Sequence, residues 1–315
     1  MSDKRFIDVD LVVQECGINT DTDSDKIVQN IINLENKYED YELIQIYNHL
    51  LTVTHDPKVL MTVITCADKF RDESTLGPLV DLLLTKTQAS QKIEIDDLIN
   101  VRALCAKAIS NHKDTSSVGA LLYCLNNKDE HYKVRLACAD ALGKIGDKYA
   151  VAPLIDLVQD EDEKSVYLKE SAASALGAIG DLRAVDPLVS ILEAKQGFLD
   201  KFSFLKERVI EALGKLNLDN KKVQKALKKS LLDSSPMVRI NAIEAIMNSN
   251  AENASEIIKD SLKDEDKEVQ KNAIIAMYNL EGRDILDEVI QSEEYSEYLK
   301  EEAQNLIDEY EEEDE

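Results

Sequence analysis

The 315-residue chain contains no tryptophan, and aromatic residues make up only 5% of it. A core without large rings has to be packed from Leu, Ile, Val and Ala, and a hydrophobic content of 44% is ample for that. A composition of this kind suits helices that stack on helices.

Cysteine is scarce, and its pattern excludes two classes of site. The cysteines are odd in number and form no CxxC pair, which argues against a disulfide framework and against a thiolate metal site. We expect them to be reduced thiols that pack as small hydrophobic residues. They are Cys16, Cys66, Cys105, Cys124 and Cys138.

Long hydrophobic runs are missing as well. The first residues lead into no apolar stretch long enough for a signal peptide, and no segment approaches the ~20 apolar residues that cross a bilayer. From this and from the cysteine pattern we expect a soluble, cytoplasmic protein.

Positive charge is in short supply. Lys and Arg number 37 against 62 for Asp and Glu, which gives a formal net charge of -25. Such a balance opposes general binding to nucleic acid or to an anionic membrane surface, so we expect neither as a partner. The acids are concentrated in residues 281–315, where sixteen stand against Arg283 and Lys300. Residues 309–315 are predicted to form a disordered acidic tail.

What the chain does contain is a repeat. Residues 134–143 return with conservative changes at residues 168–177 and 205–214. Alignment on the branched residue or leucine that opens each segment gives eight units, spaced by 30 to 42 residues. Mostly small residues follow four and seven positions later on the same helix face, where they let a neighbouring helix approach closely. The opening residues are Val59, Val101, Val134, Leu168, Leu205, Val238, Val269 and Leu299.

Shorter apolar runs precede most of these long helices, and we interpret each as the first helix of a hairpin. The runs are residues 78–84, 119–125, 153–158 and 187–192. All five prolines stand where such helices would begin, a position at which a missing amide hydrogen costs nothing. Glycines stand where the long helices should end in left-handed caps. These residues are Pro57, Pro78, Pro153, Pro187 and Pro236, and Gly143, Gly146, Gly177, Gly180 and Gly214.

The patterns together predict an all-α fold, a right-handed α-α superhelix or solenoid of about eight helical hairpins. Residues 1–40 are predicted to form N-terminal capping helices and residues 41–308 the solenoid. Hairpins in such an array bury their apolar faces only against one another, so we expect function along an extended surface.

Charged residues also recur in register with the repeat. An acid stands five residues before most opening residues, and a base stands one residue after most of them. We interpret these as structural pairs within or between units, each contributing about 0–1 kcal/mol if exposed. The acids are Asp96, Asp129, Glu163, Asp200, Asp233, Asp264 and Glu294, and the bases are Arg102, Arg135, Lys169, Lys206, Arg239 and Lys300.

The repeat carries a recognisable motif. The motif is Val-Arg-x-x-Ala-x-x-Ala-Leu-Gly-x-Ile-Gly-Asp-x-x-Ala-Val-x-Pro-Leu-Ile-x-Leu, seen over residues 134–157 with Cys138 in place of the first Ala, and again with conservative changes over residues 168–192. This motif resembles the HEAT-like repeat of the phycobilisome bilin lyase type, within the armadillo-like helical superfamily. The resemblance covers about residues 116–248 strongly and about residues 41–310 more weakly. It implies a HEAT-like solenoid, a fold found in bilin lyase subunits, metal-dependent hydroxylases and many adaptors.

Motifs for catalysis are missing. A di-iron hydroxylase of this fold would place His-Glu pairs in several repeats, but the four histidines are scattered and none precedes a Glu. HExxH, GxSxG, phosphate-loop and strand-linked GxGxxG motifs do not occur either. We therefore expect no catalytic residue, no metal and no cofactor. The histidines are His49, His55, His112 and His131.

One acidic cluster imitates the start of a calcium loop. Asp21, Asp23 and Asp25 have the right spacing, but Lys26 replaces the required glycine and Ile32 the bidentate Glu. We interpret the cluster as an acidic cap before a helix.

A candidate binding surface lies on one flank of the long helices, three, six and ten positions after the opening residues. In many such arrays this flank lines the concave side. Lysine recurs at the tenth position and forms a basic row, which is either a solvated face with local ion pairs or a groove for an extended or acidic protein segment. The candidate residues are Lys69, Lys107, Lys144, Arg208 and Lys215.

A second candidate is the connection at residues 197–204, which holds three of the five phenylalanines. Phe204 is expected to enter the core, whereas Phe198 and Phe202 are either a local cap on the loop or an exposed anchor for a partner. The other long insert, residues 86–100, is expected at the same edge. The acidic tail either aids solubility or folds over the lysine-rich stretch at 195–230 and competes with an acidic ligand.

The sequence thus predicts a non-catalytic scaffold or adaptor, not an enzyme, that binds an extended or acidic segment of another protein. The alternative, implied by the resemblance, is a bilin lyase or chromophore-handling subunit, or an enzyme assembly factor.

Overall fold

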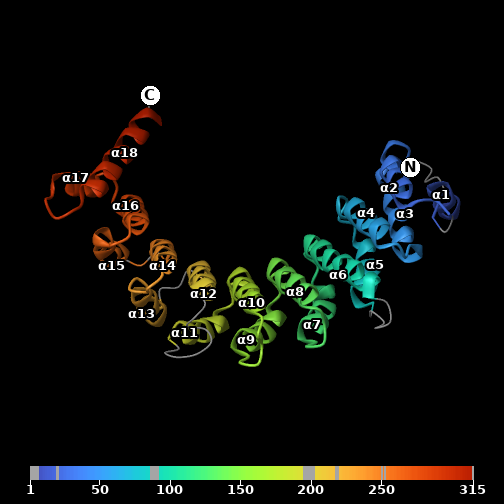
Figure 1. Cartoon of the computed structure of the whole chain (residues 1–315), viewed down its shortest axis with the longest axis horizontal. Coiled ribbons are helices and arrows are strands. Elements are labelled where there is room, and N and C mark those ends of the chain that lie inside the picture. The colour runs from blue at the N-terminus through green and yellow to red at the C-terminus, as the bar shows by residue number, and fades with distance from the viewer. Residues whose placement is uncertain are drawn as a thin grey trace, which may run out of the picture. The chain divides into compact units, whose positions relative to one another are not determined.

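The computed structural model describes residues 7–18, 21–85, 92–193, 203–216, 220–249, 251 and 253–313. Over these ranges every regular element is an α-helix or a short 3-10 helix, and no strand occurs. The chain divides into two compact units, residues 1–153 and residues 154–315. Figure 1 shows the succession of helices along the chain.

The N-terminal unit begins with α1 and α2, which lie within the segment predicted to cap the array. Three hairpins follow, and the second helices of these hairpins, α4, α6 and α8, pack on one another in order. The helices are α1 (Val9–Cys16), α2 (Ser24–Ile32), α3 (Asp40–Val53), α4 (Pro57–Asp68), α5 (Leu76–Leu84), α6 (Lys92–His112), α7 (Val118–Asn126) and α8 (Tyr132–Ile145).

The C-terminal unit contains five hairpins. The second helices α10, α12, α14, α16 and α18 pack on one another in order, and from α11 onward each first helix packs on the second helix of its own hairpin. The helices are α9 (Val151–Gln159), α10 (Val166–Ile179), α11 (Val185–Glu193), α12 (Ser203–Lys215), α13 (Lys221–Ser230), α14 (Pro236–Asn248), α15 (Ala254–Ile258), α16 (Lys267–Glu281), α17 (Asp284–Gln291) and α18 (Glu297–Glu313). Eight hairpins in the described ranges agree with the predicted number.

The core follows the predicted repeat. All eight opening residues lie on second helices and are at most 1% exposed. Apolar residues four and seven positions later are buried on the same faces, for example Cys138 and Ala141 in α8. All five cysteines are buried, as expected. Each second helix therefore contributes one apolar face to its own hairpin and to its neighbours.

Two of the five predicted glycine caps are confirmed. Gly146 and Gly180 end α8 and α10 with φ angles of 80° and 74°, a left-handed conformation that glycine adopts without strain. Gly143, Gly177 and Gly214 instead lie inside their helices, so the cap prediction was wrong for these three. A Cβ atom on Gly177 would lie 2.7 Å from Ala212 Cα of α12. Glycine is needed there because the two helices touch backbone to backbone.

The prolines lie in first turns of helices, where no backbone hydrogen bond needs their nitrogen. Pro57 and Pro236 open α4 and α14. Pro78, Pro153 and Pro187 are the third residues of α5, α9 and α11, because a 3-10 turn precedes each of these helices. The 3-10 turns are Glu73–Thr75, Lys148–Ala150 and Leu182–Ala184.

The recurring bases and acids join adjacent hairpins. Arg239 of α14 donates to both carboxylate oxygens of Asp264, in the turn before α16, at 2.8 and 2.7 Å. Lys206 of α12 pairs in the same way with Asp233 at 2.9 Å. Glu294 and Lys300 pair at the surface with Lys263 and Glu297. The pairs of Arg239 and Lys206 support the structural interpretation and are largely buried rather than exposed, since Arg239 is only 6% exposed. Loss of one partner from such a pair costs about 3–5 kcal/mol.

Two predicted loops are partly helical. Residues 92–100 of the predicted insert at 86–100 belong to α6. Helix α18 continues to Glu313 and so includes residues 309–313, and the disorder of the acidic tail stays a prediction. The helix continues because Leu299, Ala303 and Ile307 anchor it along one buried face and because Glu is a good helix former.

Candidate functional site

The predicted basic flank of the N-terminal unit is held by polar contacts between second helices. Lys144 Nζ of α8 donates to Asn111 Oδ1 of α6. Asn111 Nδ2 in turn donates to Asp68 Oδ2 of α4 at 2.6 Å. Lys69 pairs with Glu35 at 2.6 Å, whereas Lys107 is exposed and has no ion-pair partner among the described residues. Of the predicted bases on this flank, only Lys69 is paired with an acid in the described residues.

A buried polar group lies beside this chain of contacts. Both ring nitrogens of His112 and Oδ1 of Asp68 are buried and have no hydrogen-bond partner in the described part of the chain. Burial lowers the pKa of His112 and outweighs the nearby carboxylates, of which Asp68 is the strongest. The imidazole is therefore neutral at pH 7.

In the C-terminal unit the two predicted bases share one acid. Arg208 and Lys215 of α12 both bind Glu211, at 2.6 and 2.7 Å. The hydrogen bond from Lys215 is the main reason that the pKa of Glu211 is lowered. In this part of the flank the bases of the basic row therefore form local ion pairs.

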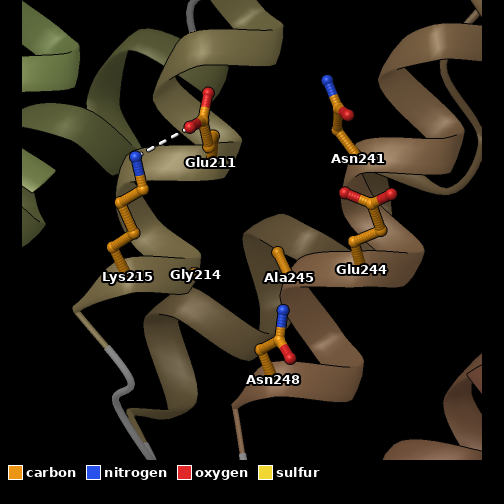
Figure 2. A pocket seen from close by; sticks show the side chains of 7 residues that line it. All are labelled: Glu211, Gly214, Lys215, Asn241, Glu244, Ala245 and Asn248. Atoms are coloured by element: carbon orange, nitrogen blue, oxygen red, sulfur yellow. Dashed lines mark hydrogen bonds and ion pairs between the residues drawn. The ribbon is translucent and has the colours of Figure 1, made fainter.

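A hollow of about 320 Å³ opens between α12 and α14 on the same flank. Gly214 and Ala245 form its floor, where a Cβ atom on Gly214 would lie only 3.1 Å from Ala245 Cβ. Figure 2 shows the side chains that rise on either side of this floor. They are Glu211 and Lys215 from α12, and Asn241, Glu244 and Asn248 from α14. All five stand at the third, sixth or tenth positions that the sequence singled out.

Three side chains of the hollow are open to a ligand. Asn241, Glu244 and Asn248 make no hydrogen bond or ion pair with any part of the chain that the structure describes. Each amide can donate two hydrogen bonds and accept two, which suits the alternating donors and acceptors of a polypeptide backbone. Asn241 and Asn248 are seven residues apart, about 10 Å along a helix. The hollow is therefore chemically suited to an extended peptide.

The connection at residues 197–204, the second candidate, is described only from residue 203 onward. Phe198 and Phe202 lie outside the described residues. Phe204 was expected to enter the core, but it is 67% exposed, while Leu205 beside it is fully buried. The prediction failed because Leu205 already occupies the core position, which leaves the preceding residue on the outer side of the first helical turn.

Neither metal nor thiol chemistry adds a site to the described residues. No group of three or more His, Cys, Asp or Glu side chains in these ranges is placed to hold a metal ion. Burial raises the pKa of the Cys105 thiol to about 12. No helix within the described ranges combines the length and the apolar character that crossing a bilayer requires.

Comparison with known proteins identifies the repeat. The HEAT repeats family matches the chain over residues 89–167, 128–205 and 200–278. No curated protein matches it. Together with the helices themselves, the family match confirms the predicted α-α superhelix class.

Three solved structures similar to this chain have different descriptions. A mutant of Kap121p has a TM-score of 0.50 and 13% identity, over 96% of this chain and 38% of that one. The complex of CpcE and CpcF of phycocyanin lyase from Nostoc sp. PCC7120 has a TM-score of 0.47 and 19% identity, and the match covers 84% of this chain and 94% of that one. Human deoxyhypusine hydroxylase has a TM-score of 0.35 and 15% identity, and the match covers 87% of this chain and 96% of that one.

Proposed function

The chain belongs to the HEAT repeat family, and on that basis we propose that it is a non-catalytic scaffold that binds another protein along its stacked second helices. Such arrays bury their apolar residues between hairpins and leave a long polar surface free for a macromolecular ligand. The hollow between α12 and α14, with its unpaired amides, is the observation that carries this proposal.

The ligand that suits the hollow is an extended segment rather than a strongly acidic one. Glu211 binds both Arg208 and Lys215, and the unpaired charge of Glu244 brings these four side chains to a net charge of zero. A polypeptide backbone held by Asn241 and Asn248 needs no charge of its own. In the N-terminal unit Lys69 is paired with Glu35 and Lys144 donates to the uncharged Asn111, whereas Lys107 is a predicted base without a partner among the described residues.

The test is quantitative capture of partners from the native host by the immobilised full chain. Replacing both amides, Asn241→Ala with Asn248→Ala, should lower recovery of the bound partner about tenfold, because two hydrogen bonds of ~0.5–1.5 kcal/mol each are lost. The matched control is Asn126→Ala, an exposed asparagine on the first helix α7. Unchanged recovery with the double variant would remove the hollow from the proposal.

A second arm decides the charge of the ligand. Lys107→Glu should leave capture unchanged if the partner is held as an extended, weakly charged segment. Loss of capture with Lys107→Glu, together with retention by the double amide variant, would show an acidic ligand on the N-terminal unit instead. No feature of the described residues favours a bilin lyase subunit over a scaffold, so that role is not proposed.

A further inference from the structure

Three successive second helices of the C-terminal unit expose a large apolar side chain at the same position. Tyr167, Phe204 and Met237 are the second residues of α10, α12 and α14, and they are 71%, 67% and 52% exposed. We call these three residues the apolar row. Each one directly precedes the buried opening residue of its helix, so none of them is needed to fill the core.

Helix formation does not explain the apolar row either. The first turn of a helix favours acidic residues, because the amide groups there carry partial positive charge. Helix α16 follows that rule and has Glu268 at the equivalent position. Soluble proteins seldom expose neighbouring large apolar residues, and where they do the patch commonly marks an interaction site, in which aromatic residues and Met are enriched.

The helices that carry the apolar row are neighbours in the array. Helix α10 packs on α12 and α12 on α14, as Figure 1 also shows. The ion pair between Lys206 and Asp233 ties the start of α12 to the turn before α14. Leu232, in that same turn, is 86% exposed and adds a fourth apolar group. With packed helices about 8–10 Å apart, the apolar row is about 20 Å long.

The charges around the apolar row differ at its two ends. Near Tyr167, the turn before α10 exposes Glu161 and Asp162 against the single base Lys164. Near Leu232, the end of α13 exposes Lys228 and Lys229. A partner that lies along the apolar row therefore meets a negative field at the α10 end and a positive field at the α13 end.

Spacing defines the conformation of the partner. A segment in the left-handed polyproline II conformation has three residues per turn and rises about 3.1 Å per residue. Every third side chain therefore faces the same way, and these side chains are about 9 Å apart. That repeat matches the separation of neighbouring helices. A segment with a large apolar residue at every third position would place one beside each member of the apolar row.

We propose that the apolar row, together with Leu232, docks an extended segment of a partner protein with large apolar side chains at every third residue and basic residues around the one at the α10 end. The proposal rests on the scaffold function but uses side chains other than those that line the hollow between α12 and α14. Its two parts, apolar spacing and charge polarity, are tested separately.

The probe for the first part is a fluorescein-labelled synthetic peptide with leucine at every third position and lysines around the first leucine. Its affinity for the full chain is measured by fluorescence anisotropy. The triple variant Tyr167→Ser, Phe204→Ser and Met237→Ser should bind at least about tenfold more weakly, since buried aromatic anchors dominate such contacts. The matched control is Leu182→Ser, which removes a 63% exposed leucine beyond the other end of α10. This control should bind as the wild type does.

Charge reversal tests the second part. Glu161→Lys with Asp162→Lys should weaken peptide binding several-fold, with the difference shrinking at high salt. Lys228→Glu with Lys229→Glu should not weaken it, because these residues lie at the other end. A peptide of equal composition with its leucines adjacent should bind more weakly than the probe.

Three results would overturn the proposal. They are undiminished binding by the triple variant, equal binding of the rearranged peptide, and a wild-type dimer in light scattering that the triple variant dissociates, which would make a second copy the occupant. The double amide variant of the hollow separates the two proposals. If it loses partner capture but still binds the probe, the hollow and the apolar row are independent sites. A wild-type chain that captures its partner but does not bind the probe removes the apolar row and leaves the scaffold function.

Discussion

Gly177 and Ala212 set the distance between two second helices. Because a Cβ atom at Gly177 would lie 2.7 Å from Ala212 Cα and 2.9 Å from Ala212 Cβ, the contact is with backbone that cannot turn aside. The helices would have to separate to admit even one methyl group. A residue at such a contact controls the packing of two hairpins at once.

Gly177→Ala is therefore expected to destabilise the protein by about 1–3 kcal/mol, the usual cost of overpacking a tight core. Gly119→Ala is the matched control, because nothing lies within 4 Å of the Cβ it would add. That control should be neutral or slightly stabilising, by up to about 1 kcal/mol, as expected for glycine replaced in a helix. Urea unfolding followed by circular dichroism gives both values, and equal midpoints for the two variants would contradict the close contact.

Glu130 gives a second residue-scale prediction, which concerns pH. Burial opposes ionisation of this carboxyl, but hydrogen bonds from Arg102, at 2.8 and 2.6 Å, and from the His131 amide outweigh it and lower its pKa below the ordinary 4.5. A carboxyl whose pKa falls on folding stabilises the protein above its unfolded pKa, and that contribution is lost as the pH falls through the folded pKa.

The free energy of unfolding should thus fall on acidification below about pH 4.5, and part of that fall should disappear in Glu130→Gln. The variant should also be less stable at pH 7, because Arg102 keeps its charge in a buried position without an anionic partner. Denaturant unfolding across pH 3–7 is the measurement, at roughly half-unit intervals. Equal free energies of unfolding for wild type and variant at every pH would show that the pair contributes nothing to stability.

At the scale of the element, the sequence predicted the helices well because their signals are local. Opening residues such as Val134 and Leu168 are followed by small residues at helical spacing, and Pro57 and Pro236 begin the helices that they were expected to begin. The hollow was located in part, since Glu211 and Asn241 stand at the predicted flank positions. That a depression lies between them depends on the approach of Gly214 to Ala245, which no single repeat reveals.

The failures at this scale share a cause. Gly177 looked like a cap because it is a glycine near a helix end, but the deciding contact comes from a helix 35 positions further along the chain. Phe204 looked like core because it is apolar, but Leu205 occupies the core position. The apolar row could have been found by comparing the residue before each opening residue across units. That comparison places Tyr167, Phe204 and Met237 in one register.

For the whole molecule, stability arises from contacts between neighbours. Helix α14 packs on α12 and α16, and α6 packs on α4 and α8, so each second helix depends on the two beside it. Arrays of this kind respond to damage locally, because no contact joins distant hairpins.

Asp264→Asn is expected to raise amide hydrogen exchange mainly in α14 and α16, because it weakens the bidentate pair with Arg239 that joins them. Exchange in α4 and α6 of the N-terminal unit should not change. Hydrogen exchange with mass spectrometry measures both regions in one experiment. A uniform increase over the whole chain would show long-range cooperativity instead.

The ion pairs between hairpins also give the array a direction. Lys206 is satisfied by Asp233 and Arg239 by Asp264, so each base depends on the hairpin that follows its own. A segment that runs from the start of one second helix to the start of the next contains both the base and the acid of such a pair. A segment that ends between the base and its acid leaves a buried charge without its partner. Duplication or deletion of such a segment, a second helix with the first helix that follows it, therefore changes the length of the protein one repeat at a time, and the surface for partners changes in the same steps.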